Sequence, residues 1–213
     1  DFELVNPEDD PRYRDYVALF HSLVGRSGVT PDTARTIVRT NTTVIGALAV
    51  KRGEADGLIC GLQGRFIKHA RDIGSVIRLQ EGMKTLAALS MLIMPRGAFF
   101  LADTYVNMDP TPAEIVAIAL QARDHLKRFN IEARAALLSY SNFGSRDGET
   151  AFKMREAYRL LKQVAPDMIV EGEMQGDAAL SEDIRRRLFP NARLKGEVNL
   201  LVMPTLDGAN IAS

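Results

Sequence analysis

Short apolar runs alternate with helix-length segments along most of this sequence, and this order constrains the fold more than any other feature. Between residues 55 and 203, the runs are separated by stretches whose apolar residues recur at the three- and four-residue spacing of a helix. Strands joined by such long crossovers pair in parallel, because each must start again from the same end of the sheet. The pattern predicts an α/β fold, an open α/β/α sandwich with a mostly parallel sheet.

The predicted strands are short and mostly apolar. Asn199-Leu200-Leu201-Val202-Met203 is apolar almost throughout, which is typical of a sheet covered by helices on both faces. Asp or Thr followed by proline marks three helix starts, because the first residue caps the helix and proline suits its first turn. Strands are predicted at 55–60, 86–94, 98–102, 134–140, 168–170 and 198–203, and helices from Asp10-Pro11, from Thr30-Pro31 to Gly53, from Thr111-Pro112, and at 68–79, 150–164 and 182–188.

A polar stretch containing proline, at 103–110, separates the chain into two halves. We therefore predict two subdomains with a cleft, at residues 1–105 and 106–213. The chain starts at Asp1 without an initiating methionine and stops at Ser213, where a further helix begins. We expect a piece that is truncated at both ends, with a second subdomain that lacks its C-terminal segment.

Charge and cysteine content limit the classes of partner. Lys and Arg number 27, as do Asp and Glu, so no overall basic field favours nucleic acid, although a local patch stays open. No apolar stretch approaches the roughly 18 residues of a membrane span. The single cysteine, Cys60, excludes an intrachain disulfide and fits a reducing, cytoplasmic compartment. Its position in a predicted apolar strand predicts an inert core thiol.

The loop after the predicted strand at 134–140 is the first candidate ligand site, because ligands of such sheets bind beyond the carboxyl ends of the strands. The loop offers hydroxyls, glycines that expose backbone amides, and an arginine just before a helix, a combination that suits a phosphate. Strand-to-helix loops are rich in Ser, Asn and Gly in any case, so composition leaves both interpretations open. The candidate ligand-binding residues here are Ser139, Ser141, Asn142, Ser145 and Arg146.

Two further loops follow predicted strands. The run Glu171-Gly172-Glu173-Met174-Gln175-Gly176-Asp177 carries three acids, which a metal site or an acid–base pair could use. The alternatives are helix capping and hydrogen bonds to nearby amides. Because the histidines are scattered, we predict no metal site. The other loop is Pro204-Thr205-Leu206-Asp207-Gly208-Ala209-Asn210, in which Asp207 is expected to be a cap or a hinge contact. From these two loops we take Gln175, Asp177, Asp207 and Asn210 as candidate ligand-binding residues.

A fourth loop, at 61–72, carries four potential cations, Arg65, Lys68, His69 and Arg71. An anionic ligand such as the phosphates of a nucleotide carrier would suit them, and the alternative is a solvated helix face. We take Arg65 and Arg71 as candidate ligand-binding residues. The sequence contains no Gly-x-Ser-x-Gly elbow, Walker loop or dinucleotide fingerprint, and we assign no catalytic residue.

Five segments, in order, resemble the phosphotransacetylase (phosphate acetyltransferase) family over nearly the whole chain. Each alone is a weak match, and their order is what makes the resemblance specific. They are Gly53-Glu54-Ala55-Asp56-Gly57-Leu58, the segment from Leu101 to Pro110, Leu138-Ser139-Tyr140-Ser141 with Gly144-Ser145, the segment from Glu171 to Ala179, and Asn199 to Pro204 with Asn210-Ile211-Ala212.

A closer likeness is to the phosphotransacetylase-like C-terminal domain of bacterial hybrid NADP-dependent malic enzymes. It rests on Arg39-Thr40-Asn41-Thr42-Thr43, on Ser141 to Asp147 and on Leu188 to Glu197. In that family an N-terminal malic enzyme module oxidatively decarboxylates malate to pyruvate with NADP and Mg or Mn. The resemblance implies that the C-terminal domain binds acetyl-CoA, inhibits the module allosterically and helps to build a homo-oligomer.

The sequence departs from true phosphotransacetylases around the pocket. The family's small polar stretch after the Ala-Asp-Gly strand is Gly64-Arg65-Phe66-Ile67-Lys68 here, and a common Ser-Ser pair is Ala87-Ala88. Only Arg71 matches the family's arginine further along. The family's catalytic Ser-Arg segment lies C-terminal of everything present. These departures imply ligand binding without turnover.

The resemblance leads to three functional hypotheses. The first is a regulatory domain of a malic enzyme that binds acetyl-CoA or CoA and builds a homodimer or higher homo-oligomer. The second is an active phosphate acetyltransferase that interconverts acetyl phosphate plus CoA with acetyl-CoA plus phosphate. The third is a purely structural dimerisation module. The expected partners are a second copy and the malic enzyme module, with no nucleic acid, no membrane and no cofactor in this chain; NADP and Mg or Mn belong to the parent.

Overall fold

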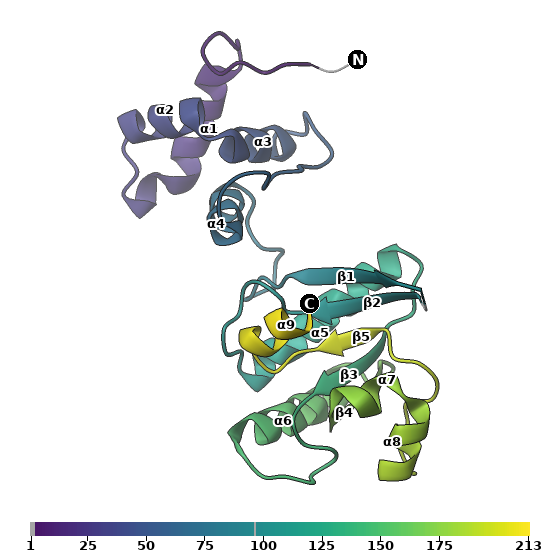
Figure 1. Cartoon of the computed structure of the whole chain (residues 1–213). Helices are drawn as coiled ribbons and strands as arrows, with labels where there is room; N and C mark the ends of the chain where they lie inside the picture. The colour runs from purple at the N-terminus through teal and green to yellow at the C-terminus, as the bar shows by residue number, and fades with distance from the viewer. Residues whose placement is uncertain (1–2, 96) are drawn as a thin grey trace. The chain divides into compact units, whose positions relative to one another are not determined.

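The computed structural model describes residues 3–95 and 97–213 of the chain (Figure 1). It divides into two compact units, Asp1–Gly82 and Met83–Ser213. The predicted division after residue 105 does not coincide with this one. The reason is that strand β2 (Gly97–Ala102) pairs with β5 (Leu200–Val202), so the hairpin that contains β2 belongs to the second unit.

The first unit is helical. Its buried residues come from successive helices and form one apolar cluster, which includes Phe20, Val38, Leu48 and Val76. The helices are α1 (Tyr13–Val24), the short η1 (Gly25–Ser27), α2 (Pro31–Thr40), α3 (Thr42–Lys51) and α4 (Phe66–Val76).

The single helix predicted from Thr30 to Gly53 is wrong, because Asn41 interrupts it. The backbone of Asn41 is extended, and its side-chain Oδ1 accepts hydrogen bonds from the amides of Thr43 and Val44. Asparagine is a favoured helix cap because its short side chain satisfies amides that have no partner inside the helix. Apolar spacing continues across the break, so periodicity alone could not reveal it.

The strand predicted at 55–60 is also wrong. No strand lies in the described part of this unit, so the backbone of the segment has no neighbouring strand to pair with. The side chain of Ile59 is fully exposed, and Cys60 is exposed as well. The prediction of a buried core thiol at Cys60 is therefore wrong.

Asp10 stabilises the start of the first unit through Arg12 rather than by capping a helix. Its carboxylate accepts from the backbone amide of Arg12 at 2.8 Å and from its guanidinium at 2.9 and 2.7 Å. These side-chain hydrogen bonds lower the pKa of Asp10 to about 2. The helix begins only at Tyr13.

We expect the stability that Asp10 contributes to be present above its unfolded pKa of about 3.9 and to be lost as the pH falls through its folded pKa of about 2. The Asp10→Asn variant should therefore be less stable than the wild type near neutral pH. The difference should shrink toward zero between about pH 4 and pH 2. Urea unfolding of both proteins across this range measures it, and a difference that stays constant with pH would contradict the assignment.

The second unit contains a five-stranded sheet with the order β1-β2-β5-β3-β4. Strands β1 and β2 form an antiparallel hairpin, and the pairs β2–β5, β5–β3 and β3–β4 are parallel. This arrangement confirms the predicted α/β fold with a mostly parallel sheet. The remaining strands are β1 (Leu89–Met94), β3 (Arg134–Leu138) and β4 (Ile169–Met174).

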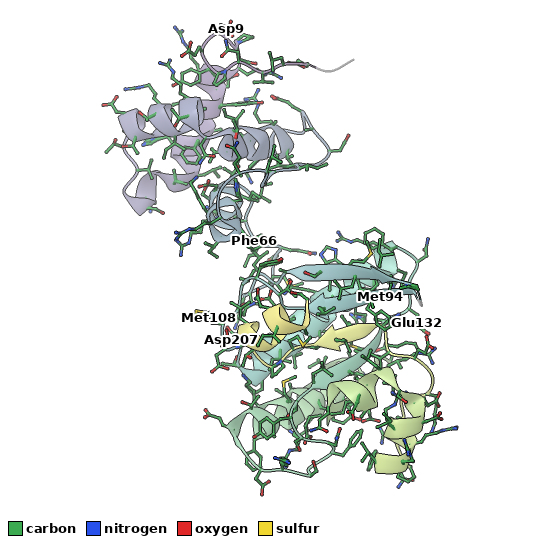
Figure 2. The ribbon with its side chains drawn as sticks, viewed as in Figure 1. Asp9, Phe66, Met94, Met108, Glu132 and Asp207 are labelled. Atoms are coloured by element: carbon green, nitrogen blue, oxygen red, sulfur yellow. The ribbon has the colours of Figure 1, made fainter. Side chains whose placement is uncertain are left out.

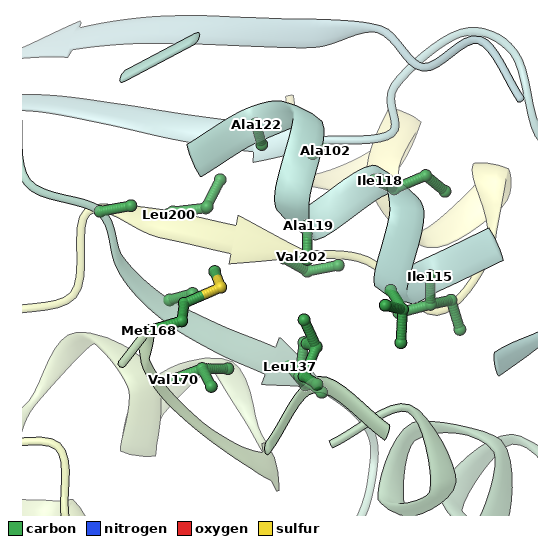
Figure 3. Packing of buried hydrophobic residues seen from close by; sticks show 14 of the residues in the cluster. Ala102, Ile115, Ile118, Ala119, Ala122, Leu137, Met168, Val170, Leu200 and Val202 are labelled. Atoms are coloured by element: carbon green, nitrogen blue, oxygen red, sulfur yellow. The ribbon is translucent and has the colours of Figure 1, made fainter. Parts of the chain in front are cut away.

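Helices cover both faces of this sheet. On one face α5 (Pro112–Arg128) and α6 (Glu149–Val164) pack on alternate strand residues such as Leu137 and Val202 (Figure 3). The intervening residues, such as Ala136, pack on the other face with α7 (Gly176–Leu180), α8 (Glu182–Leu188) and α9 (Leu206–Ala212). None of the helices in the described residues is both long and apolar enough to span a membrane.

Candidate anion-binding site

Four loops of the second unit leave the sheet at one edge. They follow β2, β5, β3 and β4, which run parallel, so their carboxyl ends lie on the same side. Figure 2 shows Met108 and Asp207, from the loops after β2 and β5, on this side, and Glu132, which precedes β3, on the opposite side. This carboxyl edge is where the sequence places its candidate ligand-binding residues in the second unit.

The loop after β3 is closed by its own serines. The hydroxyl of buried Ser141 accepts from the amide of Arg146 at 3.1 Å and lies 3.5 Å from the hydroxyl of Ser145. The Ser145 hydroxyl in turn accepts from the amide of Asn142 at 2.9 Å. The Ser139 hydroxyl accepts from the amide of Ser141 at 3.2 Å. These hydroxyls therefore hold the conformation of their own loop through hydrogen bonds inside it. The Arg146 side chain is exposed at the surface of the loop.

A pair of amide side chains joins the loops after β3 and β4. Asn142 Nδ2 donates to Gln175 Oε1 at 2.8 Å, and the backbone N–H of Gln175 donates to Asn142 Oδ1 at 2.8 Å. Gln175 Nε2 also donates to the carbonyl of Tyr140 at 2.9 Å. The sequence predicts both residues as ligand candidates, and the structure brings them together as a bridge that fixes one loop against the other.

Helix α6 starts beside this bridge without a side-chain cap. Its N-cap residue is Gly148, whose φ of 147° favours glycine, and a Cβ atom there would displace the Tyr140 hydroxyl, which lies 1.9 Å from that position. Uncapped first-turn amides carry the positive end of the helix dipole, which favours an anion. Together with the exposed Arg146, they give this loop the donor chemistry that a phosphate needs.

Two of the three acids in the run from Glu171 to Asp177 lie within β4, which extends to Met174 rather than ending at residue 170 as predicted, and they serve the backbone. Buried Glu173 accepts from the amide of Gly144 at 2.9 Å, and buried Glu171 accepts from the amide of Arg193 at 2.7 Å. Burial, with Glu171 nearby, raises the pKa of the Tyr158 hydroxyl to about 12. Asp177 is exposed and accepts from the amide of Ala178. Within residues 3–95 and 97–213, no three His, Cys, Asp or Glu side chains are grouped as a metal site.

Helix α9 contributes the last two candidates at this edge. Asp207 is exposed in its first turn. Asn210 Nδ2 donates to the carbonyl of Thr104 at 3.0 Å, and this bond ties α9 to the loop after β2. Asn210 is therefore a structural contact of the carboxyl edge, and Asp207 is free to face a ligand.

Lys153 is a residue of this edge that the sequence reasoning missed. Its ammonium donates to the carboxylate of Asp109 at 2.5 Å and to the carbonyl of Pro204 at 2.8 Å. It thereby joins α6 to the loops after β2 and β5. The only sequence signal is its position one turn into the helix that follows the loop after β3.

Arg65 and Arg71 belong to the first unit, whereas the other nine candidates belong to the second. Both arginines are exposed, Arg65 at the N-cap of α4 and Arg71 six residues further along, within the helix. His69 lies between them and fixes the loop that leads into α4. Its Nε2 lies 2.7 Å from the carbonyl of Gln63, and its Nδ1 lies 2.8 Å from the hydroxyl of Thr43.

Because a carbonyl only accepts, Nε2 of His69 carries a proton, and Nδ1 of the neutral ring accepts from Thr43. We expect His69→Asn, whose amide lies near the Nδ1 position, to lose the bond to Gln63 and to speed trypsin cleavage after Arg65 about 2- to 10-fold. His69→Gln places an amide near the Nε2 position, so it should keep the bond to Gln63 and slow trypsin cleavage relative to His69→Asn. Equal cleavage rates in the wild type and both variants would contradict this role.

The model of the phosphate acetyl/butaryl transferase family matches residues 1–213, the whole chain. The chain belongs to this family. An NAD-dependent malic enzyme of Rhizobium meliloti (strain 1021) is 59% identical over 211 residues, which are 99% of this chain and 27% of the relative. The NADP-dependent malic enzyme of Escherichia coli (strain K12) is 45% identical over 212 residues, 100% of this chain and 28% of the relative.

A solved phosphotransacetylase from Streptococcus pyogenes has the same fold as this member of the phosphate acetyl/butaryl transferase family. Its TM-score is 0.88 at 28% identity, over 100% of this chain and 64% of that chain. The two matches to malic enzymes show that the chain spans about a quarter of those relatives' length. They confirm the resemblance to the phosphotransacetylase-like domain of malic enzymes. The names of the two relatives differ in the nicotinamide cofactor.

Proposed function

We propose that this chain is the regulatory domain of a malic enzyme, that it binds acetyl-CoA or CoA, and that it contributes to a homo-oligomer. The observation that carries the proposal is the 59% identity to a malic enzyme along 99% of a chain that belongs to an acyltransferase family. A domain of that family inside a malic enzyme has the fold to bind an acyl-CoA ligand. Such binding would control the oxidative decarboxylation of malate to pyruvate by the parent enzyme.

The chemistry of the carboxyl edge supports ligand binding without turnover. The loop after β3 offers first-turn amides of α6 and the exposed Arg146, which suit phosphate oxygens. The hydroxyls of Ser141 and Ser145 are engaged within their own loop. Arg65 and Arg71 offer further guanidinium groups in the first unit. Such groups recognise the phosphates of CoA without supplying a nucleophile.

Inhibition of the parent requires a difference in affinity. Acetyl-CoA shifts a conformational equilibrium only as far as it binds one state better than the other.

The nicotinamide cofactor, NADP or NAD, and a divalent Mg or Mn ion then belong to the malic enzyme module of the same polypeptide. We place the parent in the cytoplasm, where malate and acetyl-CoA meet.

Isothermal titration calorimetry of the chain and of the parent with acetyl-CoA tests the proposal. We expect Arg71→Ala and Arg146→Ala each to weaken binding about 10- to 100-fold, since a hydrogen bond to a charged group contributes about 1.5–3 kcal/mol. Arg128→Ala, which removes an exposed arginine from the end of α5, is the matched control and should change little. Absence of binding to the parent at millimolar acetyl-CoA would overturn the proposal.

The family match also favours a second candidate, an active phosphate acetyltransferase. Acetyl phosphate plus CoA would then give acetyl-CoA plus phosphate. The pocket stretch Gly64 to Lys68, in place of small polar residues, opposes it. Consumption of the CoA thiol by the parent in the presence of acetyl phosphate would establish turnover and displace the regulatory proposal.

The third candidate is a purely structural dimerisation module. It predicts that no variant of Arg71 or Arg146 changes the response of the parent to acetyl-CoA. An unchanged oligomeric mass together with a lost acetyl-CoA response in these variants would exclude it.

A further inference from the structure

A cavity of about 560 Å³ is lined by residues of α1, α2, α3 and α4, the helices of the first unit that Figure 1 labels. Small-molecule sites in proteins have volumes of roughly 300–1,000 Å³, so this cavity is large enough for one. Part of its lining is apolar and comes from the core of the unit, with Phe20, Val24 and Val44 among its residues. The rest is polar and includes the charged residues Asp72 and Arg78. Apolar surface with a few polar groups is the composition typical of a ligand site.

Gly74 is a glycine inside α4 that lines this cavity. A Cβ atom built at Gly74 would meet open space rather than another part of the chain. The glycine inside α3, Gly46, differs, because a Cβ atom there would lie 2.5 Å from Cδ1 of Leu58. A glycine inside a helix destabilises the helix relative to alanine, and glycine is favoured where a ligand approaches the backbone closely. Packing within the chain explains Gly46, and an occupant of the cavity would explain Gly74.

Arg78 contributes a cation without a partner to the lining. Its exposed guanidinium makes no hydrogen bond or ion pair with any residue that the structure describes. A guanidinium binds a carboxylate through two parallel hydrogen bonds, which makes arginine the preferred partner of that group. The cavity is therefore suited to a ligand that carries a carboxylate.

Asp72 contributes a carboxylate of which only one oxygen is engaged. Its Oδ2 accepts from Asn41 Nδ2 at 2.9 Å and from Lys68 Nζ at 2.7 Å, whereas Oδ1 accepts no hydrogen bond within the described part of the chain. Burial opposes the ionisation of Asp72, but the hydrogen bonds from Lys68 and Asn41 keep its pKa below the ordinary value. The free Oδ1 is thus an ionised acceptor next to apolar surface, and an ammonium group would satisfy it.

We propose that this cavity binds an α-amino acid with an apolar side chain. Arg78 binds the α-carboxylate, and Oδ1 of Asp72 accepts from the α-ammonium group. The side chain of the ligand lies on the apolar lining formed by residues such as Phe20 and Val44. A carboxylic acid without an amino group would leave Oδ1 of Asp72 without a donor, and an amine without a carboxylate would leave Arg78 unpaired. The zwitterion alone matches both charges, and the proposal does not depend on acetyl-CoA binding.

Isothermal titration calorimetry of the chain with four small molecules tests the class of ligand. We expect L-phenylalanine and L-leucine to bind with dissociation constants in the millimolar range or below. The analogues 3-phenylpropionate, which lacks the ammonium group, and 2-phenylethylamine, which lacks the carboxylate, should each bind at least about 10-fold more weakly than L-phenylalanine. The proposal is overturned if neither amino acid binds at millimolar concentration, or if either analogue binds as tightly as L-phenylalanine.

Two variants test the location of the site. Gly74→Leu places a side chain in the open space of the cavity, so it should weaken the binding of L-phenylalanine at least about 10-fold. Because leucine forms helices better than glycine, this variant should melt at no lower temperature than the wild type in a circular dichroism measurement. A Gly74→Leu chain that binds L-phenylalanine as the wild type does would overturn the proposal.

Arg78→Ala should weaken the binding of L-phenylalanine about 10- to 100-fold, since it removes the partner of the carboxylate. Arg14→Ala is the matched control, because Arg14 is an exposed arginine of α1 outside the cavity lining, and it should change little. This pair decides the question if Gly74→Leu proves unstable. Equal affinities of Arg78→Ala and Arg14→Ala for L-phenylalanine would show that the cavity is not the site.

Discussion

Arg185→Leu is expected to lower the free energy of unfolding of the second unit by about 3–5 kcal/mol, since each buried acceptor left without a donor costs roughly 1–3 kcal/mol. The guanidinium of Arg185 is 1% exposed and donates only to backbone carbonyls in the described structure. Burial lowers the pKa of this group. The acceptors are the carbonyls of Ala178, Ala179, Leu194 and Gly196.

These four carbonyls come from the end of α7 and from the chain that leads toward β5. Arg185 therefore connects two segments that cover one face of the sheet, and leucine would leave their acceptors buried and unpaired. Arg185→Lys, with a single ammonium in place of a planar fork, should recover part of the loss. Urea unfolding of the wild type and both variants measures it.

The adjacent Arg186 provides the matched control. It lies on the same helix, and its side chain is exposed with an ion pair to Glu182. Arg186→Leu should cost at most about 1 kcal/mol, as exposed ion pairs do. If Arg185→Leu proves no more destabilising than Arg186→Leu, the role given to the buried guanidinium is wrong.

The burial of Arg185 could not be predicted from the sequence. It stands in the run Arg185-Arg186-Arg187, which composition alone would place on a solvated helix face. Capping, in contrast, is local chemistry and was predictable. The helix start predicted at Thr111-Pro112 is confirmed, and Thr111 and Glu114 form a capping box there, both of whose bonds lie within four residues. The burial of one arginine in three depends on carbonyls that lie up to eleven residues away.

The errors at Asn41 and at residues 55–60 both arise because apolar spacing describes only the local sequence. Apolar spacing predicted one helix through Asn41 and a strand at 55–60. The first failed because a side chain capped the following helix, and the second because a strand needs a partner strand that its unit does not contain. Local pattern identifies a segment that can form a strand, and only the surrounding chain decides whether it does.

The location of the candidate site on the sheet was predictable from the sequence, whereas the hydrogen bonds within the site were not. The rule that ligands bind beyond the carboxyl ends of parallel strands selected the correct edge for its loops. It could not show that Asn142 and Gln175 bind each other or that Ser141 closes its own loop. The bond between Asn142 and Gln175 depends on the register between β3 and β4, which shifts between Leu137 and Leu138. The shift falls at Gly172, a glycine within β4 with a φ of 153°. A glycine inside a strand is a sequence sign of a bulge, but it does not show which side chains the bulge brings together.

Asp103→Ala is the second large expected effect, also about 3–5 kcal/mol of unfolding free energy. Asp103 follows β2 directly and is 3% exposed. One carboxylate oxygen accepts from the amides of Ala88, Tyr105 and Val106, and the other accepts from the amide and the side chain of Asn107. Alanine would leave these donors without their acceptor at the carboxyl edge.

The loss should extend to the candidate site, because the next residue, Thr104, receives the hydrogen bond that anchors α9 through Asn210. Asp103→Asn keeps one acceptor oxygen but turns an amide group toward donors, so it should fall between the wild type and alanine. Asp109→Ala, which removes an exposed carboxylate paired with Lys153, is the control and should cost about 1 kcal/mol or less. Urea unfolding orders the variants, and equal losses for Asp103→Ala and Asp109→Ala would show that the loop does not depend on this carboxylate.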